Sequence, residues 1–508
     1  MAREQFILAI DQGTTNTKVI LLSRSGAIVA AASRPLSVSF PRDGWVEQDA
    51  RELWVSVLEA ATACLAQANQ PEIAAIGVSN QRESVVVWDR RSGEPIGPCI
   101  VWQCRRTEAV CSELRTEGHE SAIREKSGLS IDPLFSGSKI GWLLAHTSDG
   151  SEKAASGEFC AGTVDSWLLW KLTGSAVHAT DASNASRTQL LNLNSTQWDD
   201  DLLRLFRVPR ACLPEVRPSS GVFGLTASGG PWPAEVPIGG MVGDSHAALF
   251  AHAAFAPGIL KATYGTGSSV MTLTSNPVIS TRGLSTTIAW RLGQQSSYAL
   301  EGNITNTGGT IQWLGELLSL SNPVEGVAKL AATVSDSGGV YIVPAFAGLG
   351  APHWDPRARG LICGLTRGST AAHLARAAVE STAFQIRDVF ESMCRDGNIG
   401  APVLHADGGA SRNDVLMQFQ ADILGCPVVR SSSADFSARG AAWMAGLAVG
   451  FWKSLAELQA LPMDAERFTP SMPAGHKEEL LNGWNDALRR ARSAQGKSAS
   501  METIHAAN

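Results

Sequence analysis

The sequence predicts an α/β protein made of two related halves, each with a sheet covered by helices. Three observations support this prediction. The chain has 508 residues, more than one domain of roughly 100–200 residues requires. Strand-like and helix-like segments alternate along it, which favours sheets covered by helices. A strand–turn–strand pattern near the start occurs again about half a chain length later.

The composition excludes several classes of protein. The chain carries 42 Lys and Arg against 48 Asp and Glu, a net charge of −6, and has no basic block, which argues against a dedicated nucleic-acid binder. Its longest nearly apolar run, 440–452, is shorter than the roughly 20 residues of a membrane-spanning helix. Nine cysteines without a CxxC pair favour reduced thiols, and the start lacks a secretory signal pattern. We therefore expect a cytoplasmic protein without membrane insertion.

The first predicted elements are strands. Residues 6–11 (FILAID) and 19–24 (VILLSR) are apolar runs on either side of a Gly/Thr turn, and 27–36 supplies a third strand. Residues 49–68 form a predicted helix, because its apolar residues share one face. These residues are Trp54, Val57, Leu58, Ala61 and Leu65. Two more strands are expected at 73–80 and 84–89, so the order is mixed β-hairpin and αβ.

The opening pattern is repeated at residues 259–274 (ILKATYGTGSSVMTLT). Gly13-Thr14 and Gly265-Thr266 lie 252 positions apart. One such hairpin is commonplace, but two at this spacing indicate a duplicated domain. We therefore predict one domain over 1–253 and a second over 254–508.

Two helices are predicted in the second half. In 370–395 the apolar positions step by three and four. In 411–425, Ser411 and Asp414 are typical of a capping box, and Gly425 is a typical C-terminal stop.

Three glycine-rich turns, at 11–15, 264–268 and 407–410, each follow a predicted strand. Glycine lets backbone N–H groups crowd an anion, and Thr or Ser hydroxyls add donors. One such turn is usually only a turn, but three together favour a nucleotide phosphate site. The chain has no GxxxxGK[ST] segment, so this would not be a P-loop enzyme.

Two aspartates stand beside these turns or at other strand ends. Asp11 ends the first strand, where it could hold Mg²⁺ through water. Asp244 follows the apolar run VPIGGMVG and could accept the proton of an attacking hydroxyl. Without context, an aspartate at a turn more often has a structural role. His246 has no neighbouring ligand and is expected to be structural.

Arg82 and Glu83 lie between two predicted strands and offer donors and acceptors suited to vicinal hydroxyls. A solvated surface pair is the more common interpretation of such neighbours. Trp102 could form an apolar wall for a carbon chain or belong to the core.

With these motifs in their order along 6–452, the chain resembles the FGGY family of carbohydrate kinases, and within it the members that phosphorylate glycerol. The resemblance is carried by DQGTTNTK, AAIGVSNQRE, IVWQCRRT, GTVDSWLLWKLTG, TYGTGSS and DGGASRND. It implies two ribonuclease-H-like domains of the actin/hexokinase type, with the catalytic cleft between them. It also implies transfer of a phosphoryl group from ATP, with Mg²⁺, to a primary hydroxyl of a small polyol or sugar. Relatives of this kind are often dimers or tetramers, so a homo-oligomer is expected.

The resemblance also implies roles for single residues. The residues implied for ATP are Thr14, Thr15, Asn16, Lys18, Thr266, Gly308, Gln312, Gly409 and Asn413. Asp244 matches the general base, Asp11 and Asp244 match the magnesium-associated acids, and Arg82, Glu83 and Trp102 match the polyol site. Lys18 replaces an arginine, which keeps the charge but not the planar fork.

Three positions on the implied substrate side depart from the pattern of the glycerol-specific members. Leu134 replaces a tyrosine, Ser245 a glutamine and Ser269 a bulkier side chain. Each change removes side-chain volume or a hydrogen-bonding group. The alternative to a glycerol site is therefore a roomier pocket that accepts a tetritol, pentitol or ketose. The stretch 301–306 is also more polar than these members suggest.

Two functions of another class remain possible from the sequence. The same fold serves actin-like ATPases, but these lack the NQRE and WQCRRT segments. A sensor that binds sugar or nucleotide without catalysis would not need Asp11, Asp244 and all three glycine-rich turns. The kinase is therefore the favoured function.

Overall fold

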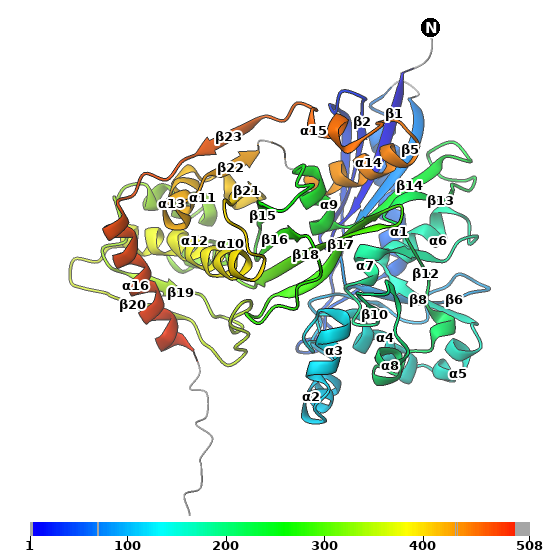
Figure 1. Ribbon diagram of the computed structural model, residues 1–508, viewed down its shortest axis with the longest axis horizontal. Helices are drawn as coiled ribbons and strands as arrows, with labels where there is room; N and C mark the ends of the chain where they lie inside the picture. Colours follow the sequence, from blue (N-terminus) through cyan, green and yellow to red (C-terminus); the bar gives the residue numbers. More distant parts are fainter. Residues whose placement is uncertain (1–3, 69–70, 432, 434, 493–508) are drawn as a thin grey trace, which may run out of the picture.

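The computed structural model describes residues 4–68, 71–431, 433 and 435–492. A 13-stranded sheet runs through the whole molecule, and helices cover it on both sides (Figure 1). Its strand order is β23-β22-β21-β15-β16-β18-β17-β13-β14-β5-β1-β2-β3. The mixed α/β architecture expected from the sequence is therefore confirmed.

Five strands of the first half form one unit of this sheet. They are β1 (Gln5–Gln12), β2 (Asn16–Leu22), β3 (Ile28–Pro35), β5 (Glu72–Asn80) and β14 (Pro237–Gly243). β1 and β2 form an antiparallel hairpin, β3 pairs antiparallel with β2, and β5 and β14 follow on the other side of β1 in parallel.

Five strands of the second half repeat this order. They are β15 (Ile259–Tyr264), β16 (Ser268–Thr274), β18 (Gln295–Ile304), β21 (Val403–Asp407) and β22 (Val428–Ser431). β15 and β16 form the antiparallel hairpin, β18 pairs antiparallel with β16, and β21 and β22 follow β15 in parallel. The two hairpins that the sequence repeats thus occupy equivalent places. The remaining strands of the large sheet are β13 (Ser220–Leu225), β17 (Ser285–Leu292) and β23 (Ala465–Phe468).

A smaller four-stranded sheet lies beside the first unit. Its strands are β4 (Glu47–Gln48), β6 (Val85–Asp89), β7 (Cys99–Ile100) and β8 (Phe159–Thr163). Short two-stranded pairs are β9 (Ala179–Asp181) with β12 (Glu215–Arg217), β10 (Leu191–Asn192) with β11 (Gln197–Trp198), and β19 (Tyr341–Val343) with β20 (Leu361–Cys363).

The helices of the first half are α1 (Ala50–Leu65), α2 (Glu108–Thr116), α3 (Glu120–Ser127), α4 (Ser136–Ala145), α5 (Gly150–Ala155), α6 (Val164–Leu172), α7 (Ala182–Ala185), α8 (Asp200–Leu205), η1 (Arg210–Cys212) and α9 (Asp244–Ala251).

The helices of the second half are α10 (Gly308–Leu317), α11 (Pro323–Ala331), α12 (Ala371–Asp396), η2 (Gly409–Arg412), α13 (Asp414–Leu424), α14 (Phe436–Ala448), α15 (Leu455–Gln459) and α16 (Ala474–Ala491). α12 confirms the helix predicted over 370–395, and Gly425 ends α13 in the left-handed conformation as expected. The capping box predicted at Ser411 is wrong. Ser411 lies within the 3₁₀ turn η2, and the Asn413 side chain caps α13 by accepting a hydrogen bond from the Leu416 N–H.

α14 comes from the second half of the chain but packs on the sheet of the first half, against β1, β5 and β14 (Figure 1, orange). Glycines make this approach possible. A Cβ atom at Gly77 would lie 2.2 Å from the Ala441 carbonyl oxygen, and one at Gly440 would lie 2.0 Å from that of Ala247 on α9. The two halves are therefore joined by backbone-to-backbone packing as well as by the continuous sheet.

Two expectations concern the whole chain. Within the described residues no helix is both long and apolar enough to cross a membrane. All nine cysteines lie in the described ranges, and none forms a disulfide there.

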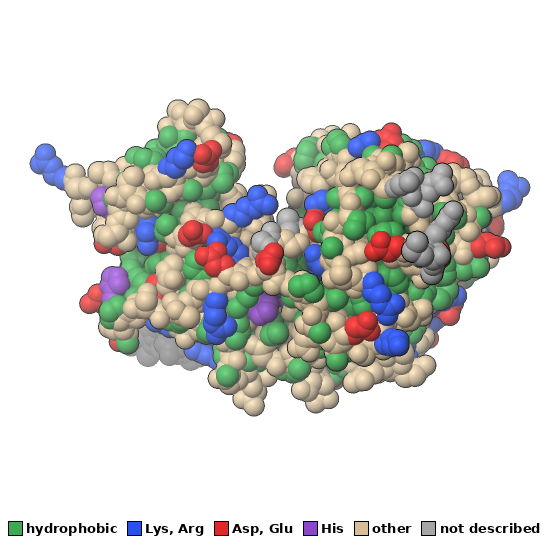
Figure 2. Space-filling view, turned by 90° about the horizontal axis from the view of Figure 1, so that it is seen from above, with side chains coloured by type: hydrophobic (Ala, Val, Ile, Leu, Met, Phe, Trp, Pro, Cys, Tyr) green, Lys and Arg blue, Asp and Glu red, His purple; other side chains and the backbone are tan. Residues whose placement is uncertain are grey.

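Viewed from above, the surface is hollowed between two lobes, and charged side chains gather at the bottom of the hollow (Figure 2).

Candidate active site

The predicted polyol and catalytic residues meet at the carboxyl ends of three neighbouring strands. Arg82 and Glu83 follow β5, Asp244 follows β14, and Asp11 lies at the end of β1, which pairs with β5. The Ser79 hydroxyl donates to Asp11 Oδ1 at 2.9 Å. The carboxyl edge of parallel strands is where ligands bind in α/β sheets, because loops there diverge and leave a crevice.

Arg82 is buried and binds two carboxylates. Its Nε donates to Asp244 Oδ1 at 3.0 Å, and its two Nη atoms donate to Glu301 at 3.0 and 2.6 Å. The Arg82 side chain is 7% exposed, whereas that of Asp244 is 37% exposed. The alternative of a solvated Arg82–Glu83 surface pair is therefore wrong, and Asp244 is the member of this group that faces solvent.

Glu83 is fixed from both its backbone and its side chain. Its φ of +61° is uncommon for a residue with a side chain. Its carbonyl accepts hydrogen bonds from Ser136 Oγ at 3.1 Å and Lys139 Nζ at 3.3 Å, and its Oε1 accepts one from Arg187 Nε at 2.6 Å. Burial lowers the pKa of Lys139 to about 8. Lys139 also donates to the Leu134 carbonyl at 2.5 Å, so one amine sets the positions of two predicted substrate residues.

Trp102 connects the candidate polyol residues to the hairpin of β1 and β2, which carries the first glycine-rich turn and is called here the first phosphate hairpin. Its indole Nε1 donates to Thr14 Oγ1 at 2.9 Å, and its backbone N–H donates to Ser84 Oγ at 3.1 Å. The ring is half-buried at the edge of an apolar cluster of the first half. Trp102 thus lies beside Thr14 of the first hairpin and packs against the edge of the core.

The first hairpin presents its turn to solvent. The Gly13 N–H donates to the Asn16 carbonyl at 2.9 Å and closes the turn, while Thr15 and Asn16 are exposed. Lys18 forms an ion pair with Asp435, which precedes α14. This contact joins the first hairpin to a segment of the second half.

The second hairpin is tied to the start of α10. The Thr266 carbonyl accepts hydrogen bonds from the N–H groups of Thr307 and Gly309, each at 2.9 Å, and the Gly308 N–H donates to the Gly265 carbonyl at 3.0 Å. Thr266 is exposed, and so is Gln312 one turn further along α10. The structure therefore brings Thr266, Gly308 and Gln312 together.

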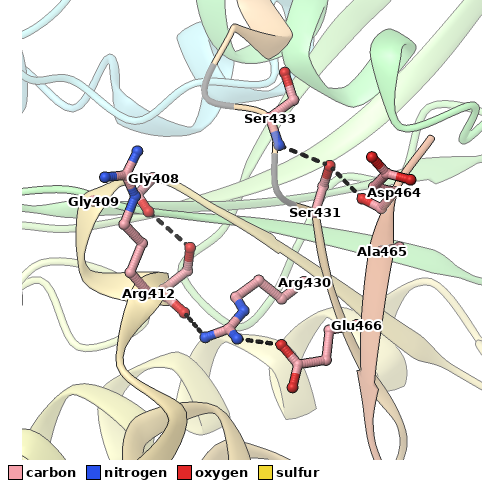
Figure 3. Close-up of a pocket in the computed structure, with 10 residues that line it drawn as sticks. Gly408, Gly409, Arg412, Arg430, Ser431, Ser433, Asp464, Ala465 and Glu466 are labelled. Atoms are coloured by element: carbon pink, nitrogen blue, oxygen red, sulfur yellow. Dashed lines mark hydrogen bonds and ion pairs between the residues drawn. The ribbon is translucent and has the colours of Figure 1, made fainter.

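The third glycine-rich turn lines a cavity of about 520 Å³ (Figure 3). Gly408 has a φ of +91°, and a Cβ atom there would lie 2.6 Å from the Tyr264 carbonyl oxygen, so this turn lies against the second hairpin. Gly409 is exposed at the cavity, and Asn413 caps α13 next to it. Across the cavity, Arg430 donates to the Ser411 carbonyl at 3.0 Å and pairs with Glu466.

Asp11 and Asp244 lie close enough to influence each other. Burial and, next, the charge of Asp244 raise the pKa of Asp11 to about 7, against the opposing effects of Ser79 and Lys18. Among the described residues no three His, Cys, Asp or Glu side chains form a metal-holding cluster. Two carboxylates close enough to interact electrostatically fit a cation that takes its other ligands from water and phosphate, as Mg²⁺ does.

The three substrate positions that depart from the resemblance are all half-buried. Ser269 Oγ donates to Glu301 Oε1 at 3.1 Å, and the Ser245 N–H donates to Asp244 Oδ1 at 2.6 Å. Sequence reasoning missed Glu301, Arg187, Lys139 and Asp435. The polarity of 301–306 was the one signal, since a glutamate among apolar strand residues indicates a buried partner.

Two units of the same strand order, each with an antiparallel hairpin closed by a glycine-rich turn, define a two-domain phosphotransferase of the actin/hexokinase type. Residues 6–251 match the N-terminal domain of the FGGY family of carbohydrate kinases, and residues 260–449 match its C-terminal domain. The chain belongs to this family.

Named relatives cover almost the whole chain. It is 50% identical to a glycerol kinase of Trichlorobacter lovleyi over 490 residues, which is 96% of this chain and 99% of the relative. It is 48% identical to glycerol kinase 2 of Thermotoga maritima over the same shares of the two chains. The solved structure of Plasmodium falciparum glycerol kinase with ADP is similar with a TM-score of 0.91 at 32% identity, covering 96% of this chain and 98% of that one.

Proposed function

We propose that the protein transfers the γ-phosphoryl group of ATP to a primary hydroxyl of glycerol, giving glycerol 3-phosphate. Family membership and the full-length similarity to proteins named glycerol kinase support this proposal. The observation that carries it is the placement of Asp244, bound through Oδ1 to buried Arg82 but still partly exposed, where β5 and β14 end.

The polyol is proposed to bind to Arg82 and Glu83 with Trp102 as its apolar wall. Because Oδ1 of Asp244 is held by Arg82, we assign proton acceptance from the attacking hydroxyl to Oδ2. The hydrogen bond from Trp102 Nε1 to Thr14 Oγ1 supports a polyol position next to the first hairpin, which would suit in-line attack on a phosphate bound there.

The nucleotide is proposed to lie across both hairpins. Thr14, Thr15, Asn16 and Lys18 would bind phosphate oxygens from one side, and Thr266, Gly308 and Gln312 from the other. Gly409 and Asn413 would bind the nucleoside end, supported by the cavity that their turn lines. Loop amides and hydroxyls of this kind stabilise the charge that develops on the transferred phosphoryl group.

Asp11 and Asp244 would hold Mg²⁺, through water in the case of Asp11. When bound, the ion neutralises negative charge on the β- and γ-phosphates. Burial and, next, the charge of Asp244 raise the pKa of Asp11, and the second of these causes supports the assignment because a cation would relieve the repulsion between the two carboxylates.

Further parts of the proposal concern the whole molecule. We propose functional domains over 1–253 and 254–508, a cytoplasmic location, and a homo-oligomer. Size-exclusion chromatography with light scattering tests the last of these; a monomer would contradict it.

A larger polyol or ketose is the second candidate substrate, and the small or apolar residues Leu134, Ser245 and Ser269 favour it. The test is ADP formation by the wild-type protein with glycerol, erythritol, xylitol and D-xylulose. The highest kcat/KM for glycerol supports the first proposal, and a higher value for a longer acceptor replaces it with the second. ATP consumption that no acceptor stimulates contradicts both.

A further inference from the structure

We propose that Glu301 and Arg187 are positioning residues of the polyol site, which orient Arg82, Glu83 and Asp244 without touching the substrate. This inference rests on the proposed function, because it assumes that these three residues bind or activate a polyol. It adds two residues that no motif of the sequence singles out for the site.

The observation is an unbroken chain of five charged side chains. Asp244 Oδ1 accepts from Arg82 Nε at 3.0 Å, and both Nη atoms of Arg82 donate to Glu301. Glu301 Oε2 lies 2.8 Å from Arg187 Nη1, and Arg187 Nε donates to Glu83 Oε1 at 2.6 Å. Carboxylates and guanidinium groups alternate, and both ends of the chain are residues of the proposed polyol site.

The middle of the chain is sealed from water. The side chains of Arg187 and Glu301 are 0% exposed. Burial alone would raise the pKa of Glu301, but Arg187 and Arg82 outweigh it and lower that pKa well below its usual range. The carboxylate is therefore ionised and bound on both sides, and charged groups held this way in a low-dielectric interior have little freedom to reorient.

The chain also crosses between the two halves. Glu301 lies on β18 in the second unit of the sheet, whereas Arg82, Glu83, Arg187 and Asp244 belong to the first half. Ser269, on the strand of the second phosphate hairpin, donates to the same carboxylate. The sheet that carries the second hairpin thus fixes the arginine of the polyol site.

Positioning and mere stabilisation predict different kinetics. Without Glu301, both Nη atoms of Arg82 lose their partner, and without Arg187 the Glu83 carboxylate loses its donor. Either loss disorders groups proposed to hold the polyol, but neither residue contacts the hairpin turns proposed to hold ATP. The KM for the polyol should therefore change while the KM for ATP does not.

The test compares Glu301→Gln and Arg187→Lys with wild type. Gln keeps the shape of the side chain and removes its charge; Lys keeps a cation but cannot bind Glu83 and Glu301 together. Both variants should raise the KM for glycerol by about tenfold or more and leave the KM for ATP within about twofold. Asp396→Asn is the control, since the Asp396 side chain is only 9% exposed and is bound to Ser280 and Arg282 at the C-terminal end of α12; both of its KM values should stay within about twofold of wild type.

Equal rises in the two KM values, or no rise in either, would overturn the positioning role. If Glu301→Gln does not fold, Arg187→Lys decides alone, because it preserves the number of buried charges. The acceptor in these assays is whichever polyol of the panel the wild type phosphorylates best. A wild type without activity on any polyol refutes the proposed function, whereas an active wild type with unchanged variants refutes only this inference.

Discussion

The two phosphate hairpins share a fold but differ in charge. Counted from their turn glycines, Asp11 and Lys18 of the first hairpin correspond to Thr263 and Val270 of the second. In the first hairpin the two charged residues face each other across β1 and β2. In the second, the turn is instead tied by backbone hydrogen bonds to the start of α10.

This difference indicates a division of labour between equivalent elements. The first half holds the charged groups that are proposed to lie beside the reacting atoms, including Asp244 directly after β14. The second half supplies neutral donors at its hairpin turn, and its carboxylate Glu301 lies one strand further along the sheet on β18. Substitution of the charged residues of the first half should therefore lower activity more than substitution of the neutral donors at the second hairpin turn.

The largest effect is expected from Asp244→Asn. Removing the proposed proton acceptor should lower kcat by about 10²–10⁴-fold, the usual contribution of a general base. ATP binding, measured by calorimetry on the same variant, should persist because the hairpin turns are untouched. A loss of activity below about tenfold would show that the first half does not supply the base.

The close packing of α14 against the first half of the chain can be tested at Gly440. A Cβ atom there would meet the Ala247 backbone oxygen at 2.0 Å, so Gly440→Ala should lower the free energy of unfolding by about 2–4 kcal/mol in urea titrations. Gly475→Ala on α16, where no atom lies within 4 Å, is the matched control and should change it by less than about 1 kcal/mol. Equal changes in the free energy of unfolding for the two variants would mean that the close packing of α14 does not contribute to stability.

The hairpins themselves are compared by Lys18→Met and Thr266→Val. Loss of the first hairpin's cation should reduce kcat/KM for ATP by about 10–100-fold, whereas loss of a neutral hydroxyl from the second should cost less than about tenfold. Lys18→Arg should restore most of the activity, because it retains the charge. A greater loss in Thr266→Val than in Lys18→Met would reverse the proposed division.

Local patterns predicted most of the fold. Both hairpins, α12, the left-handed stop at Gly425 and the position of Asp244 at a strand end follow from periodicity and turn residues within short windows. The capping box at Ser411 failed because the positive φ of Gly408 begins a 3₁₀ turn, which moves the helix cap to Asn413 and the helix start to Asp414. Two local signals competed there, and only the backbone decides between them.

The contacts that define the site were beyond local reasoning. Arg82 and Glu301 lie 219 positions apart, Arg187 and Glu83 104, and Lys18 and Asp435 417. Adjacent Arg and Glu in a loop are usually solvated, and only the distant partners explain why Arg82 and Glu83 are buried. Charge pairs that cross from one half to the other have no spacing rule in the sequence.

The smallest effect concerns the titration of Asp11. In the folded apo protein its pKa is raised to about 7, whereas the unfolded chain has the ordinary value of 3.8. Between these values the native state holds a proton that the unfolded state has lost, so the stability contributed by protonated Asp11 decreases as pH rises toward 7. Asp11→Asn removes this loss. The free energy of unfolding of the variant relative to that of wild type should therefore be higher at pH 8 than at pH 5.

The expected gain is on the order of 1–2 kcal/mol, less than the full value of such a shift because the carboxyl retains some solvent contact. Urea unfolding of wild type and Asp11→Asn at both pH values measures it. Ser79→Ala removes a hydrogen bond that lowers the pKa of Asp11, so the pH window should move upward in that variant. A difference between wild type and Asp11→Asn that does not vary with pH would mean that Asp244 and burial do not perturb Asp11. The position of Asp11 in the first hairpin would then be electrostatically no different from the equivalent position of Thr263 in the second.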